Sequence, residues 1–529
     1  MKIYKSIVFA AAFATLSIVY SCDDVLDVQP ESFVADFNRT PAELDASLLG
    51  VYDAMQSAYN EANFVFGEYR TDSYDIAGNN VVRASIQNST MTENISELSW
   101  RDFYRVIDRA NRIIISGEKL PGADKNTIAQ AYAIRSKVYF DLIRIWGNVP
   151  LLLEPIKTAS DAYKPLSSFD KIMNEVVIPD MLTAEKSISA TPSSFNFSLT
   201  SVLAHQAEVY MWQKREDLAI PILLKIKANA AYRLANSPSE WQDMFLNQPV
   251  NPLYPNGQKI QKGPELIFSI GYQDADPTAS RHFIAWTGGA KIMVIRRAVE
   301  DKWIERFPND AAAWDAKYPG VTPAIAADPT NATNPRYFYG DWRLFSTRET
   351  GLFQSSIGTF LNNRAVPTNT TALGLGTAAI GDARLHKWNK ERSGFVNNLD
   401  RTDVVMYRLA DMNLLLAEAY IKTDQPTLAL NLINELRTAR KLPAVIVAEF
   451  GTTKDQQINY LLDERQFELM GEGKRWWDLV RNNKVLEIMN PILQQRGVRE
   501  ITQGRIVWPI SNNHILESLG QYEQIPAWK

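Results

Sequence analysis

Cysteine is almost absent from this chain of 529 residues, which holds one, Cys22. A single thiol cannot form an internal disulfide, so the fold must be held together by its core alone. Cys22 is then a buried apolar thiol, a catalytic nucleophile or an attachment point. Long hydrophobic runs are also scarce. The one long uncharged stretch, residues 7–20, has 14 apolar or small residues, and roughly 20 are needed to span a bilayer as a helix.

Charge of one sign does not accumulate either. The formal net charge is -4, with no basic run or stripe, which argues against a nucleic-acid partner. Common catalytic and cofactor motifs are missing as well: no nucleophile elbow, Walker loop or dinucleotide fingerprint occurs. The four histidines, His205, His282, His386 and His514, lack metal-ligand spacing. We therefore expect no cofactor, no metal and no enzyme activity.

The start of the chain explains its single cysteine. Lys2 and Lys5, then residues 7–20, then a small residue before position 22, form the pattern of a secretory signal peptide. Residues 19–22, Val-Tyr-Ser-Cys, resemble the lipobox of bacterial lipoproteins, in which the cysteine is acylated. We predict a lipoprotein signal peptide over 1–21, lipidation of Cys22 and a lipidated tether over 22–38. The acidic pair Asp23–Asp24 is either an inner-membrane retention mark or a surface-export mark.

Helix signals dominate the rest of the chain. Thr40 is a predicted N-cap, with Pro41 at the first helical position and Glu43 completing a capping box. Two more amphipathic helices are predicted within residues 100–120 and 128–152, and Gly147 ends the second of these helices. Strand signals are few.

An internal repeat divides the chain. Residues 207–223 align without gaps on residues 417–433, and five positions are identical in the two copies. Such small-residue helix pairs resemble tetratricopeptide repeats. Two copies so far apart require a long insertion. We predict an all-α (mainly α) single domain over 39–529, made of a helical part (39–236), a loop-rich ligand-binding insertion (237–400) and a second helical part (401–529).

The densest charged segment is residues 463–481. Glu464, Glu468 and Glu472 follow one another at a spacing of four, which places them on one helix face. They are either the acid and base of a glycosidase or part of a salt-bridged helix pair that turns at residues 471–473. The second reading is favoured, because glycosidase carboxylates must face each other across a substrate. The expected neutralising cations are Arg465, Lys474, Arg475 and Arg481.

Several segments in a fixed order carry a family resemblance. Residues 464–481, ERQFELMGEGKRWWDLVR, closely resemble the C-terminal signature of the SusD/RagB family of Gram-negative outer-membrane lipoproteins. Residues 103–114, 131–152, 407–443 and 508–528 are similar to other signatures of that family. The resemblance covers most of the mature chain.

The resemblance implies a function. It implies an α-rich scaffold of tetratricopeptide-like pairs, anchored by lipid in the outer membrane and exposed at the cell surface. It also implies a lid on a SusC-like TonB-dependent transporter, which captures a nutrient, usually a glycan, for import without catalysis. Asp23–Asp24 is then better read as an export mark. An oligopeptide-binding RagB-type lipoprotein is the alternative, and a surface glycosidase is a weaker one.

The ligand residues are expected in two regions, because the family builds its sites from the segment after the first helix and from the insertion. Sugars stack on aromatic rings and hydrogen-bond to polar side chains. The predicted contacts are Tyr69, Arg70, Tyr74, Asn79 and Asn80 in the first region, and Trp286, Trp303, Trp314, Tyr337, Tyr339 and Trp342 in the second. Trp303 and Trp314 lie in helix-like sequence and are equally candidates for packing. Trp100, Trp146 and at least one of Trp476 and Trp477 are expected in the core.

Overall fold

The computed structural model describes residues 38–78, 80–245, 261–272, 293–323, 339–348, 381–383, 385, 387–388 and 403–529. Helices dominate it, so the predicted mainly α-helical class is confirmed. Residues 38–245 hold α2 (Pro41–Tyr59), α3 (Ala62–Glu68), α4 (Val81–Gln87), α5 (Arg101–Gly117), α6 (Lys125–Trp146), α7 (Ala159–Ala162), α8 (Phe169–Ile172), α9 (Ile178–Glu185), α10 (Leu199–Trp212), α11 (Glu216–Lys227) and α12 (Pro238–Asp243).

Shorter helices follow in the middle of the chain, and long ones return after residue 403. The middle helices are α14 (Arg297–Arg306), α15 (Ala311–Lys317) and α16 (Trp342–Thr347). The last group is α17 (Leu409–Lys422), α18 (Pro426–Ala439), α19 (Val447–Phe450), α20 (Lys454–Leu469), α21 (Arg475–Arg481), α22 (Val485–Gln495) and α23 (Asn512–Glu517). The domain boundaries predicted at residues 236 and 400 stay predictions.

Local sequence signals set the ends of the long helices. Thr40 Oγ1 accepts a hydrogen bond from the Glu43 N–H at 3.2 Å, and Glu43 Oε2 accepts one from the Thr40 N–H at 3.2 Å. This is the predicted capping box of α2. α6 ends at Gly147, whose φ of +77° is a conformation that glycine adopts readily.

The predicted internal repeat is also a structural repeat. α10 with α11, and α17 with α18, form two helix pairs whose turns match. Each turn contains one residue of positive φ, Lys214 at +58° and Asp424 at +61°. The next N–H, of Arg215 or Gln425, donates to the carbonyl five residues earlier, at 2.9 and 2.8 Å respectively. The tetratricopeptide-like pairs are thus confirmed, and α11 packs directly on α17.

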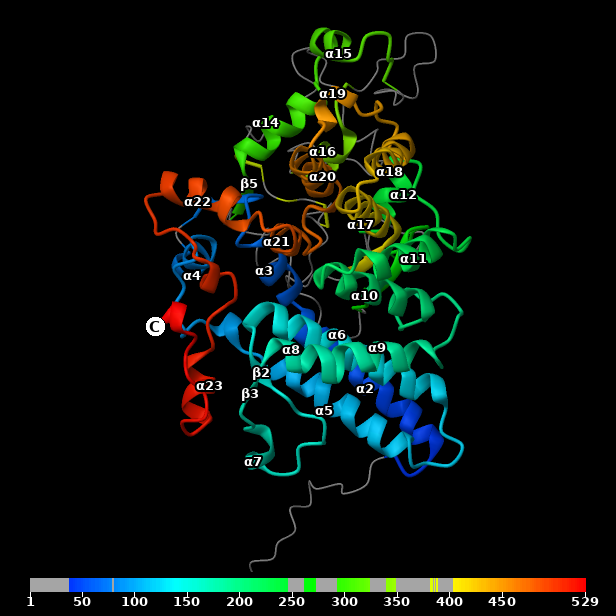
Figure 1. Ribbon diagram of the computed structural model, residues 1–529, viewed down its shortest axis with the longest axis vertical. Helices are drawn as coiled ribbons and strands as arrows, with labels where there is room; N and C mark the ends of the chain where they lie inside the picture. The colour runs from blue at the N-terminus through cyan, green and yellow to red at the C-terminus, as the bar shows by residue number, and fades with distance from the viewer. Residues whose placement is uncertain are drawn as a thin grey trace, which may run out of the picture.

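The helices form two groups. α2, α5, α6, α8 and α9 make the lower group in Figure 1, and α10, α11, α17, α18 and α20 stack above them. α10 of the upper group packs directly on α9 and α6 of the lower group, which joins the two groups into one core. α14, α15 and α16 lie at the top of the view, at the far end from α2 and α5.

The described strands form three short antiparallel ladders. β1 (Tyr74–Ile76) pairs with β5 (Met293–Ile295), β2 (Val149–Pro150) with β3 (Leu166–Ser167), and β4 (Leu266–Ile270) with β6 (Val404–Arg408). β4 lies before the long middle segment and β6 lies after it. The β4–β6 ladder therefore brings together the two ends of that segment.

The aromatic core agrees with prediction. Trp100, Trp146, Trp476 and Trp477 are all buried. Trp100 stacks on the ring of His514 with 4.6 Å between centroids, which ties α23 to the start of α5. None of the helices in the described ranges is both long and apolar enough to span a bilayer.

Candidate functional site

The two regions predicted to hold the ligand meet at the β1–β5 ladder. Tyr74 pairs with Ile295 and Ile76 with Met293, antiparallel. The chain therefore leaves β1 toward Asn80 at the same end of the ladder at which it enters β5. We call residues 74–78, 80 and 293–296 the β1–β5 edge, and we take it as the candidate site.

The β1–β5 edge carries charged groups. The Asp75 side chain is 40% exposed, lies 3.7 Å from Arg296 Nε and accepts a hydrogen bond from Arg496 Nη2. Arg496 caps the C-terminal end of α22, so the edge is tied to the C-terminal helices. The Arg296 N–H also donates to the Ser73 carbonyl at 2.9 Å, which extends the contact between the two segments. Two guanidinium groups and one carboxylate give the edge polar groups that suit hydroxyl recognition.

Asn80 lies on this edge as a helix cap. It is half-buried, and its Oδ1 accepts a hydrogen bond from the Arg83 N–H at 3.0 Å, which starts α4. Asn79, Trp286 and Tyr337, and the predicted lipidation site Cys22, lie outside the described residues.

Tyr69, Arg70 and Tyr74 are buried in the interior. The Arg70 guanidinium lies 4.5 Å from the centre of the Trp476 ring and donates to the Arg505 carbonyl at 2.6 Å. Burial, together with the smaller effect of the nearby Arg505 charge, lowers the pKa of Arg70 to about 9. Arg70 thus joins the N-terminal segment to the C-terminal one, and the buried rings of Tyr69 and Tyr74, which contact Phe64, present no open face to a sugar.

The three tryptophans predicted in the middle segment are buried too. The indole N–H groups of Trp303, Trp314 and Trp342 donate to Asp341 Oδ2 (2.8 Å), the Val321 carbonyl (2.7 Å) and the Arg440 carbonyl (2.6 Å). Tyr339 is half-buried and meets Trp314 edge-on, with 6.2 Å between ring centres. Of the predicted contacts that the structure describes, Asn80 and Tyr339 thus keep exposed surface.

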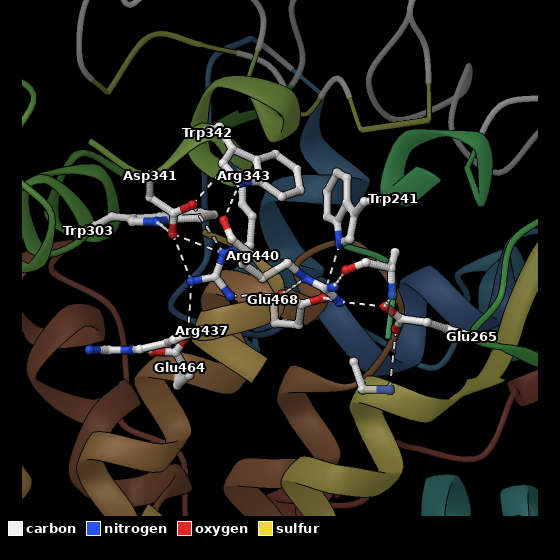
Figure 2. Close-up of polar contacts among 12 residues, drawn as sticks. Trp241, Glu265, Trp303, Asp341, Trp342, Arg343, Arg437, Arg440, Glu464 and Glu468 are labelled. Carbon is white, nitrogen blue, oxygen red and sulfur yellow. Dashed lines mark hydrogen bonds and ion pairs between the residues drawn. The ribbon is translucent and has the colours of Figure 1, made fainter. Parts of the chain in front are cut away.

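A buried charge network joins the middle segment to α20, and Figure 2 shows its centre. Arg343 of α16 donates to Glu464 Oε1 and Glu468 Oε2, both at 2.8 Å. Glu468 also accepts from Arg408 at 2.8 Å and Arg440 at 2.7 Å. The network also contains the ion pairs Arg343 with Asp341, Arg437 with Glu464, Arg408 with Glu265 and Glu472, Arg440 with Glu265, and Lys387 with Glu472.

These pairings decide the role of the three glutamates. Burial alone would raise the pKa of Glu464, but the Arg437 and Arg343 charges outweigh burial and hold it at about 2. The same balance, with Arg440, Arg408 and Arg343 as the cations, holds the pKa of Glu468 well below its usual range. A carboxylate that stays ionised and has no access to solvent cannot serve as the general acid of a glycosidase. The salt-bridged reading of this segment is confirmed.

The predicted neutralising cations were wrong. Arg465 pairs with Asp411 and Asp478, Lys474 with Asp411, Arg475 with Asp72, and Arg481 with Glu418 and Asp478. The cations that do bind the three glutamates come from α16, α18, β6 and the segment around Lys387. The i, i+3 spacing of Arg437 and Arg440 was the one local signal that could have pointed to them.

The network is buried and holds elements of the middle segment on α20. Arg343 and Asp341 fix α16, and Glu265 and Arg408 fix the β4–β6 ladder, all against α20. Within the described residues, no cluster of three or more His, Cys, Asp or Glu side chains could hold a metal ion.

Comparisons with known proteins agree over the whole chain. A family profile described as "SusD family" matches residues 361–528, and one described as "Starch-binding associating with outer membrane" matches residues 24–211. The chain is 33% identical over 549 aligned positions to SusD-like protein P38 of Formosa agariphila, covering 99% of this chain and 100% of that one.

Solved structures share the fold. A SusD superfamily protein from Bacteroides vulgatus superposes with a TM-score of 0.67 at 17% identity, covering 93% of this chain and 100% of its own. A laminarin-binding SusD-like protein superposes with a TM-score of 0.61 at 19% identity, covering 92% and 99%.

Proposed function

The chain belongs to the SusD family of nutrient-binding outer-membrane proteins, and on that premise we propose that it captures a glycan at the cell surface for import. In this proposal, lipid on Cys22 anchors the protein, and a SusC-like TonB-dependent transporter takes up the captured oligosaccharide or polysaccharide. The protein itself performs no catalysis.

One observation carries the choice of a glycan over an oligopeptide. The profile that matches residues 24–211 is described as starch-binding, and these residues include the whole first candidate region, 69–80. The laminarin-binding protein of the same fold gives independent support for a glucan-type ligand.

We place the ligand at the β1–β5 edge and over the adjoining middle segment. Asn80 and Tyr339 supply exposed polar and aromatic surface, and Asn79, Trp286 and Tyr337 are proposed from the sequence as further contacts. Aromatic rings and hydrogen-bonding groups are the side chains that suit a sugar, whose C–H face stacks while its hydroxyls form hydrogen bonds.

The proposal is tested by binding. The purified full chain is titrated by calorimetry, and run in affinity electrophoresis, against starch, laminarin and other plant, host and microbial glycans. We expect saturable binding to at least one polysaccharide and to its oligosaccharides, with no release of reducing ends.

Two outcomes would contradict this reading. Binding to oligopeptides with no binding to any glycan would favour the RagB-type alternative. Release of reducing ends by purified protein would favour a glycosidase, with acid and base other than Glu464, Glu468 and Glu472.

A further inference from the structure

A cavity lies where three helix turns of the scaffold meet, far from the β1–β5 edge in the sequence. It has a volume of about 340 Å³, which is at the lower end of the range for small-ligand pockets. Its lining comes from the turn between α10 and α11, the end of α17, the start of α20 and the turn between α21 and α22. The lining residues are Lys214, Glu216, Lys422, Lys454, Asp455, Ile458, Arg481, Asn482, Asn483 and Lys484.

Cations dominate this lining. Four lysines and one arginine face two carboxylates, Glu216 and Asp455. Lys214 is exposed and makes no ion pair with any residue that the structure describes. Its backbone φ of +58° belongs to the repeated turn of the helix pairs, so the fold fixes the place of its Cα beside the cavity.

The other lining cations pair with carboxylates both on and off the cavity wall. On the wall, Asp455 binds Lys484 at 2.5 Å and Glu216 lies 3.9 Å from Lys422. Glu418 is buried and binds Arg481 at 2.7 Å and Lys422 at 2.8 Å. Asp424 binds Lys454 at 2.9 Å and is 80% exposed, and Glu487 binds Lys484 at 2.7 Å and is 58% exposed. With five cationic and two anionic side chains, the lining carries an excess of positive charge.

We propose that this cavity binds an oxyanion of the sulfate or phosphate class, either free or carried on a sugar. Lys214, Lys422 and Lys454 supply charge, and Asn482 and Asn483 supply amide groups. The site is separate from the proposed glycan site, and either can fail without the other.

The test is calorimetry of the full chain at low ionic strength with three probes: sodium sulfate, glucose 6-sulfate and glucose. We expect saturable binding of at least one anion and none of glucose at this cavity. The Lys214→Gln/Lys454→Gln variant should weaken that binding about tenfold, which corresponds to 1.4 kcal/mol. Glu216→Gln should tighten it, because that change removes a carboxylate from the wall.

A matched control separates the cavity from general surface charge. The Lys119→Gln/Lys186→Gln variant removes two exposed lysines that do not line the cavity and should leave the affinity unchanged.

Equal affinity for sulfate and glucose 6-sulfate would identify a free anion, and tighter binding of the sugar ester would identify a sugar-borne one. The proposal is overturned if neither anion binds saturably, or if binding is the same in the wild type and in the Lys214→Gln/Lys454→Gln variant. Binding of neutral polysaccharide should not differ between them.

Discussion

Glu68 is a buried carboxyl group that forms no ion pair with any residue in the described ranges. Its Oε1 accepts hydrogen bonds from the N–H groups of Gly473 at 3.0 Å and Lys474 at 3.2 Å, while its Oε2 has no donor there. Burial raises the pKa of Glu68 to about 8, although those backbone donors act in the opposite direction. Glu68 therefore differs from Glu464 and Glu468, whose arginine partners keep them ionised.

The raised pKa predicts a pH dependence of stability. The folded protein holds the Glu68 proton more tightly than the unfolded chain, so stability is fully present below pH 4.5 and falls as the pH rises to about 8. Glu68→Gln should remove this loss. Between pH 5 and pH 8, the free energy of unfolding of the variant should rise relative to that of the wild type by on the order of 2 kcal/mol. Urea denaturation at both pH values measures it.

The control for Glu68→Gln is Glu523→Gln, whose side chain is 82% exposed. This change should leave the pH profile of stability as it is in the wild type. Parallel pH profiles for Glu68→Gln and wild type would contradict a proton held by Glu68.

A second residue-scale prediction concerns the proposed glycan site. Trp286→Ala should lower affinity for the bound polysaccharide by at least about tenfold, as expected for an aromatic side chain at the centre of a binding site. Calorimetry measures the change, and Trp212→Phe on α10 is the control, since Trp212 packs against Phe140 and Trp477. Full affinity in the Trp286→Ala protein would remove this residue from the site.

At the scale of elements, the charge network and apolar packing together hold α16 in place. It has six residues, too few for a helix to be stable alone in water, and Arg343 binds Asp341, Glu464 and Glu468 at once. Arg343→Met should cost about 3–5 kcal/mol, because it leaves three buried carboxylates with fewer cations. Chemical denaturation gives the stability, and limited proteolysis should show earlier cleavage near α16.

Arg297→Met on α14 is the matched control, because its side chain is 73% exposed and pairs with Asp301 one turn away. It should change stability by less than about 0.5 kcal/mol. Equal losses in the Arg343 and Arg297 variants would mean that the network does not hold α16.

The structural features that the sequence predicted correctly are those set by residues close together in the chain. The Thr40 capping box, the end of α6 at Gly147 and the matching turns at Lys214 and Asp424 all follow from residues within a few positions of one another. The network was not predictable in detail, because Arg343 and Glu468 are 125 residues apart. For the same reason, aromatic residues such as Trp342 looked available for ligand in the sequence, although a distant carbonyl, that of Arg440, binds the indole.

At the scale of the whole molecule, the described helices make one scaffold that carries two proposed binding regions. The β1–β5 edge joins the N-terminal part to the middle segment, and the cationic cavity lies among the turns of the helix pairs. The charge network links the middle segment to the helix pairs through α20. We infer that ligand capture and anion binding use a common rigid frame without sharing residues.

Membrane attachment is the remaining whole-molecule prediction, and it rests on Cys22 alone. Cys22→Ala should fold normally and move the protein from the membrane fraction to the soluble fraction, because no acyl chain can then be attached.

Asp23→Asn/Asp24→Asn should instead keep the protein in the membrane fraction but lower its cleavage by protease added to intact cells, since it changes only the proposed export mark. Fractionation and protease shaving distinguish these outcomes. Cys22→Ala protein that stays with the membrane would contradict lipid anchoring, and an unchanged shaving pattern in the double variant would contradict the export role of the acidic pair.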